Sequence, residues 1–168
     1  MTQQPNWWLI LVVALIPLVI GFIWYNPKVF GNAWMRTAEI DEERAQSGNM
    51  LKIFGLTYLF SILAAYMLAM GSVHQSGIIQ LFLGDPALED PNSAISTFVN
   101  EFMTTYGDRH RSFSHGVIHG IETAVFYGLA LIGINCLFER RPFKYALIHL
   151  GYWIVCFAIM GGLLCQFF

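Results

Sequence analysis

Long apolar stretches alternate with short polar segments along this chain. The apolar stretches cover residues 7–25, 53–70, 116–138 and 145–168, and Glu122 is the one Asp, Glu, Lys or Arg inside them. An α-helix rises about 1.5 Å per residue, so each stretch can cross the roughly 30 Å hydrocarbon core of a bilayer. The pattern predicts an all-α protein, an integral membrane four-helix bundle that forms a single domain over residues 1–168.

The first stretch has the ends expected of a membrane span. Trp7 and Trp8 begin it, and Trp24 and Tyr25 end it, which puts amphipathic rings at both membrane interfaces. Pro17 predicts a kink, which other helices of a bundle can accommodate. No basic residue precedes the stretch and no small-residue cleavage pattern ends it, so we expect a span and not a cleaved signal peptide.

Two of the connections are predicted to contain helices of their own. In the long central connection, residues 71–115, Asp90 and Pro91 form a helix-start signal. Apolar residues follow at helical spacing and predict an amphipathic helix over about 91–106. In the first connection, Asp41 is expected to cap a short helix.

Composition supports the membrane assignment and excludes several classes of protein. The chain is 56% hydrophobic and 12% charged, which is unlike a soluble domain. A net charge of −2 argues against nucleic acid as a partner, and three cysteines without a C-x-x-C pair argue against a disulfide framework or a zinc finger. No established catalytic motif is present, so we do not expect an enzyme.

The basic residues predict an orientation. Seven of the nine Lys and Arg residues lie in the first and third connections, and basic residues near span ends stay on the cytoplasmic side. We therefore expect both termini and the central connection to lie outside the cytoplasm. The seven residues are Lys28, Arg36, Arg44, Lys52, Arg140, Arg141 and Lys144.

The third stretch carries the residues most suggestive of chemistry. His115, His119 and Glu122 fall on one helical stripe, and a carboxylate within a span usually faces protein or a water-filled cavity. One interpretation is a zinc or copper site in which His110 or His74 completes the ligands. A second is a path for protons or ions. A third is structural: the histidines are polar anchors at headgroup depth, and Glu122 is hydrogen-bonded to a Thr or Tyr.

Small residues form a ridge on the other side of the same stretch. They are Gly116, Gly120, Ala124 and Gly128. Such a ridge lets two helix backbones approach closely, either within the bundle or between copies of the chain.

The fourth stretch has a second polar stripe, His149, Trp153, Cys156 and Met160. Histidine and methionine can bind haem or copper, but an aromatic and methionine stripe is typical of helix packing. Because a hairpin places His149 opposite about Ile132, we expect this stripe to lie apart from Glu122.

Two segments resemble a known family. Residues 24–27 (WYNP) with 30–35 (FGNAWM), and 137–144 (LFERRPFK) with Gly151, Tyr152, Trp153, Met160 and Gly161, are similar to the bacterial membrane family called domain of unknown function 1761. The resemblance implies a small four-helix protein of the bacterial inner membrane. It implies no reaction. The central connection is longer than is usual in that family, and His149 stands where its pattern leads us to expect Asn.

These features predict a small multi-pass protein that acts as a structural or accessory subunit. Its expected partners are the lipid bilayer and either another copy of the chain or a different membrane protein. The alternatives are a small proton- or ion-linked transporter that uses Glu122, and an outward-facing metal-binding protein.

Overall fold

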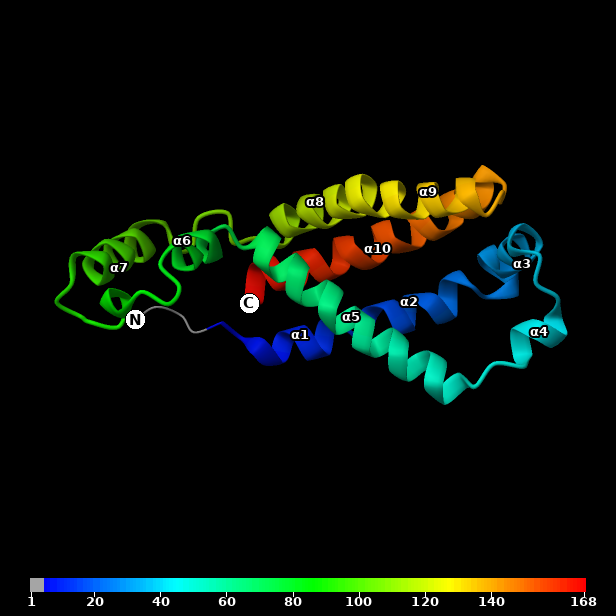
Figure 1. Cartoon of the computed structure of the whole chain (residues 1–168), viewed down its shortest axis with the longest axis horizontal. Helices are drawn as coiled ribbons and strands as arrows, with labels where there is room; N and C mark the ends of the chain where they lie inside the picture. Colours follow the sequence, from blue (N-terminus) through cyan, green and yellow to red (C-terminus); the bar gives the residue numbers. More distant parts are fainter. Residues whose placement is uncertain (1–4) are drawn as a thin grey trace.

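Four long helices form the body of the molecule. The computed structural model describes residues 5–168, and within this range the secondary structure is entirely helical. Four helices are long and apolar enough to cross a membrane: Trp7–Trp24, Met50–Ser72, Phe113–Phe138 and Phe143–Phe167. Figure 1 shows them side by side, with a smaller helical part beyond one end of the bundle. The predicted fold class is confirmed. The second helix begins three residues before and ends two residues after the predicted 53–70, and the third begins three residues before the predicted 116–138.

The first span is broken where proline requires it. Helix α1 (Trp7–Val13) is followed by a turn at residues 14–15 and then by α2 (Ile16–Trp24). Pro17 has no amide hydrogen, and its ring would clash with the carbonyl four residues earlier, at Val13. The Tyr152 hydroxyl donates a 2.7 Å hydrogen bond to the Pro17 carbonyl, so the fourth span fixes the break.

The connection after α2 holds three short helices. They are the π-helical turn η1 (Pro27–Gly31), α3 (Asn32–Ala38) and α4 (Glu42–Gln46). A carboxylate oxygen of Asp41 accepts a 2.7 Å hydrogen bond from the Arg44 amide, which confirms the predicted cap. Helix α5 (Met50–Ser72) then forms the second span.

The third and fourth spans pack together along the small-residue ridge. The third consists of α8 (Phe113–Thr123), the π-helical turn η3 (Ala124–Gly128) and α9 (Leu129–Phe138), and the fourth is α10 (Phe143–Phe167). A Cβ atom on Gly116 would overlap the Gly161 carbonyl, and one on Gly120 would overlap the Phe157 carbonyl. At Gly116 and Gly120 the ridge therefore packs within the chain.

The central connection differs from its predicted form. It contains α6 (Gln75–Leu81), which the hydrophobic pattern did not predict, the 3₁₀ turn η2 (Pro86–Leu88) and α7 (Ala94–Tyr106). Helix α7 begins three residues later than predicted, because Ser93 and not Asp90 is its cap: the Ser93 hydroxyl oxygen accepts a 2.9 Å hydrogen bond from the Ser96 amide. Figure 1 shows α6 and α7 beyond the end of the bundle at which the chain ends.

Helix α10 is the centre of the bundle. In its most apolar window 44% of the residues are buried, against 11–22% in the other three spans. Its Cys156, Met160 and Leu164 are fully buried among side chains of α1 and α5. The outer faces of the other spans carry exposed Leu, Ile and Phe side chains, as expected of surfaces in contact with lipid.

Candidate metal centre

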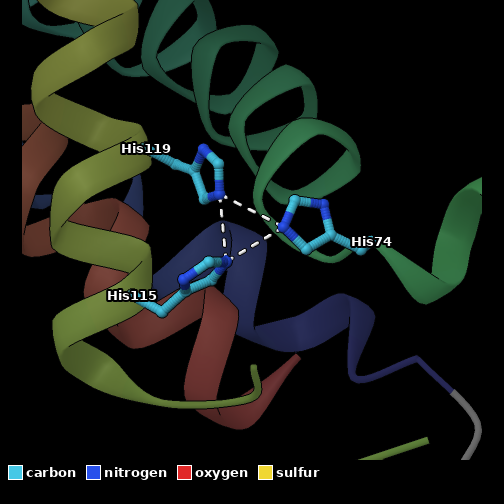
Figure 2. Close-up of side chains that lie close together, drawn as sticks. All are labelled: His74, His115 and His119. Atoms are coloured by element: carbon cyan, nitrogen blue, oxygen red, sulfur yellow. Dashed lines mark hydrogen bonds between the residues drawn. The ribbon is translucent and has the colours of Figure 1, made fainter. Parts of the chain in front are cut away.

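Three histidines from distant parts of the sequence meet at one end of the bundle. His74 lies between α5 and α6, and His115 and His119 lie on the first turns of α8. Ser112 caps α8 by accepting a 3.3 Å hydrogen bond from the His115 amide, and this starts the helix so that both histidines share one face. Figure 2 shows the three rings pointing toward a common centre.

The Nε2 atoms of these rings form a small triangle. The separations are 2.9 Å for His74 and His115, 3.0 Å for His115 and His119, and 3.3 Å for His74 and His119. Each Nε2 atom has either one proton or one lone pair to direct, so three neutral rings cannot satisfy all three contacts with good hydrogen bonds. One nitrogen from each ring is instead offered to a single point.

The size of the triangle suits a first-row metal ion. Its three corners lie on a circle of radius about 1.8 Å, so an ion at about 2.0–2.1 Å from each nitrogen would sit about 1 Å above their plane. Three imidazole ligands leave a fourth tetrahedral position open. Together with the loop-borne His110, these are the histidines that the sequence pattern pointed to.

Glu122 lies beside His119, on the side of the ring that faces away from the triangle. As a candidate it belonged to the ligand set, but its Oε2 atom lies 3.2 Å from Nδ1 of His119, the nitrogen that faces away from the triangle. A carboxylate there favours a proton on Nδ1 and therefore a lone pair on Nε2. The side chain is 52% exposed. The structural interpretation, a hydrogen bond to Thr or Tyr, is not what the structure shows.

His110 lies beside the triangle without joining it. Its ring stacks on His115 at 5.0 Å between centroids and with 26° between the planes. Its backbone is left-handed, with φ at 62°, a conformation that costs energy in a residue other than glycine. The Cys165 thiol donates a 3.3 Å hydrogen bond to its carbonyl, so the fourth span helps to hold this loop.

The net charge of the central connection and the pKa of His74 both bear on metal binding. Residues 73–112 contain five acidic side chains and two basic ones, so the connection is net negative. The pKa of His74 is lowered, first by loss of hydration where its ring packs among the others and then by the like charges that His119 and His110 would carry. A lowered pKa keeps the His74 ring neutral and able to bind a metal.

The residues of the second polar stripe lie in two different environments. Cys156 and Met160 are completely buried in the bundle core, whereas His149 accepts or donates a 2.8 Å hydrogen bond between Nδ1 and the Tyr25 hydroxyl. His149 and Trp153 also line a cavity of about 190 Å³ at the other end of the bundle. The structure therefore does not gather this stripe into one ligand set.

Other residues near the centre had no signal in the sequence. Gln75 is buried, and its amide group donates hydrogen bonds of 3.0 Å to the Tyr106 carbonyl and 2.8 Å to the Arg109 carbonyl. These bonds fix the loop before α8. Because α6 was not predicted, nothing in the pattern distinguished Gln75 from other polar residues of the connection.

Comparison with known proteins identifies a family but no activity. The family model described as "Protein of unknown function (DUF1761)" matches residues 8–165. Neither a curated protein nor a solved structure gives a significant match. The matched range covers the three converging histidines and the four spans, except for one residue at the start of the first span and two at the end of the fourth. The chain therefore belongs to the DUF1761 family of proteins of unknown function.

Proposed function

We propose that this protein binds one divalent metal ion of the zinc class at the end of its membrane bundle. His74, His115 and His119 supply the three ligands. The observation that carries the proposal is the convergence of their Nε2 atoms within 2.9–3.3 Å of one another. Histidines that only anchor a helix at a membrane interface need water or headgroups around each ring, and they gain nothing from directing the same atom at one point.

Glu122 supports the same proposal. It lies nine residues after the start of α8 at Phe113, about 13 Å along the helix axis. A carboxylate at such a depth costs a few kcal/mol unless a cation offsets it. A metal ion bound to Nε2 of His119 supplies positive charge one ring away from the carboxylate.

The ligand chemistry selects the kind of metal. Imidazole nitrogens suit zinc and copper, whereas magnesium and calcium prefer oxygen ligands. Three histidines with one open position form a common tetrahedral zinc arrangement. We therefore take zinc as the first metal to test and copper as the second.

We place the centre outside the cytoplasm of a bacterial inner membrane. The support is the basic residues, seven of which lie in the two connections at the opposite end of the bundle. The acidic outer connection would raise the local concentration of cations at this end.

Metal analysis of untagged protein tests the proposal. Protein purified without a His-tag, loaded with zinc and dialysed, is expected to retain one zinc per chain. His74→Ala and His119→Ala are each expected to lose it, and His149→Asn, which removes a histidine far from the triangle, is expected to keep it. Thermal unfolding of each metal-free variant checks that the fold survives. Zinc well below one per chain in the wild type, or equal zinc in all four proteins, would overturn the proposal.

An accessory role is a second candidate, supported by the outer connection. Leu81, Leu83 and Phe98 there are 74%, 77% and 50% exposed, so this part could dock on a partner protein or a second copy. Photo-crosslinking from position 98 in native membranes is expected to give one discrete larger product. Labelling of lipid alone would count against it.

Proton or ion transport through Glu122 is a further alternative. It depends on the same contact between Glu122 and His119 as the metal centre, so Glu122→Gln tests both functions.

A further inference from the structure

A cleft opens beside the three histidines on the outer side of the bundle. It is open to the surface and has a volume of about 280 Å³, the space of about nine water molecules at about 30 Å³ each. Its walls come from α6, from the end of α7 and from the loop that leads into α8. They are His74, Gln75, Ile78, Phe102, Tyr106, Arg109 and His110.

The cleft is built on a fixed loop. The buried Gln75 side chain binds the carbonyls of Tyr106 and Arg109 at 3.0 and 2.8 Å. A single side chain therefore holds α6 against both the last turn of α7 and the loop. Residues held in this way need little ordering when a ligand binds, which favours affinity.

Arg109 provides the charge in the cleft. Its guanidinium carbon lies 5.9 Å from the centre of the Tyr106 ring. Among residues 5–168 no carboxylate lies within ion-pair distance of Arg109, although the connection contains five acidic residues. An unpaired guanidinium on the wall of a cleft is suited to a carboxylate or phosphate, which it can bind through two parallel hydrogen bonds.

The other walls of the cleft are apolar, in contrast to Arg109, and they indicate what the rest of the ligand is like. Ile78 and Phe102 are apolar, and both are partly buried. A ligand that contacts them and Arg109 together has a short apolar part and an anionic group. The volume of the cleft suits a ligand of about ten non-hydrogen atoms.

The cleft and the histidine triangle share a wall. His74 belongs to both, and His110 lines the cleft while its ring stacks on His115. We propose that the cleft binds a small amphiphilic anion, of the class of short-chain carboxylates, whose charged group lies between Arg109 and the metal centre. Arg109 is one positive group that would hold the anion, and the metal ion is the other. The inference therefore rests in part on the proposed metal centre. Arg109 and the bound metal would both repel a cationic ligand at this place.

Binding of a fluorinated carboxylate tests the inference. Wild-type protein in detergent is titrated with 6,6,6-trifluorohexanoate and followed by ¹⁹F NMR, with the protein either metal-free or zinc-loaded. The arginine variant is Arg109→Gln, and the matched control is Arg111→Gln, which removes a basic residue two positions away that does not line the cleft. Hexylamine carrying the same trifluoromethyl group tests the sign of the charge.

The expected result is saturable binding of the carboxylate that Arg109→Gln weakens about tenfold and Arg111→Gln leaves unchanged. The amine is expected not to compete. Zinc is expected to tighten the binding. Equal binding by the two variants, or displacement by the amine, would overturn the inference. Zinc content is measured on the same samples. Absence of zinc would count against the proposed metal centre. The comparison of Arg109→Gln with Arg111→Gln would still test whether the cleft binds an anion.

Discussion

Glu122→Gln should weaken zinc binding without removing any ligand. The substitution keeps the size of the side chain and takes away its charge. In the structure Oε2 of Glu122 lies 3.2 Å from Nδ1 of His119. The carboxylate is therefore about 7 Å from an ion held on the far nitrogen of that ring, with the metal–nitrogen bond at about 2.1 Å.

The size of the effect follows from this distance. Two positive charges and one negative charge at about 7 Å attract by about 1.2–2.4 kcal/mol for an effective dielectric constant of about 40–80, and lipid around Glu122 would make the attraction larger, so this range is a lower bound. This corresponds to about an 8- to 60-fold weaker zinc affinity. Changes in carboxylates that contact metal-bound histidines have effects of the same order, about 10- to 100-fold.

Competition with a chromophoric chelator in lipid nanodiscs measures the zinc affinity directly. Glu139→Gln is the matched control, since this glutamate follows the other end of the third span and should leave the affinity unchanged. A change of less than about twofold for Glu122→Gln, or the same change for both variants, would show that the ion does not sit on His119 as proposed.

Three further outcomes are expected. Because the pKa of His74 is lowered, its proton should compete with zinc only below the ordinary histidine pKa of about 6.5; zinc affinity should fall with decreasing pH by up to about tenfold per pH unit for each proton that the ligand rings take up, as pH-dependent zinc titrations can measure. Gly120→Ala should destabilise the bundle by about 1–3 kcal/mol because the new Cβ meets the Phe157 carbonyl, whereas Gly133→Ala, where the nearest atom lies at 3.9 Å, should not; unfolding in mixed detergent compares the two, and equal stability would contradict the packing described. In a cysteine-free background, a membrane-impermeant maleimide applied to intact cells should label Asn92→Cys and not Ser47→Cys, and the reverse pattern would invert the orientation.

The spans could be predicted from the sequence because a bilayer imposes both a length and an absence of charge. The short helix α6 could not be predicted in this way. It covers Gln75–Leu81, too few residues to show a clear period, and contacts of Gln75 with the distant loop hold it. The start of α7 was misplaced because Asp90 and Ser93 are both good capping residues three positions apart, and the sequence does not show which of them the chain uses.

The site was predicted in part, for equally physical reasons. Helical spacing puts His115 and His119 on one face, and this needs no tertiary information. His74 joins them across 41 positions because α5 ends beside the start of α8, which depends on how the spans cross. Spacing placed Glu122 on the same face as His119, but it does not give which nitrogen of a neighbouring ring a carboxylate approaches.

X-ray absorption at the zinc edge of zinc-loaded protein tests the central claim most directly, because it counts the ligands of the metal itself. The expected spectrum is a four-coordinate shell at about 2.0 Å with the outer-shell scattering of three imidazole rings and one further light atom. His119→Ala should lose one ring from the fit or lose the zinc. A six-coordinate oxygen shell without imidazole scattering in the wild type would show that the three histidines do not hold the ion.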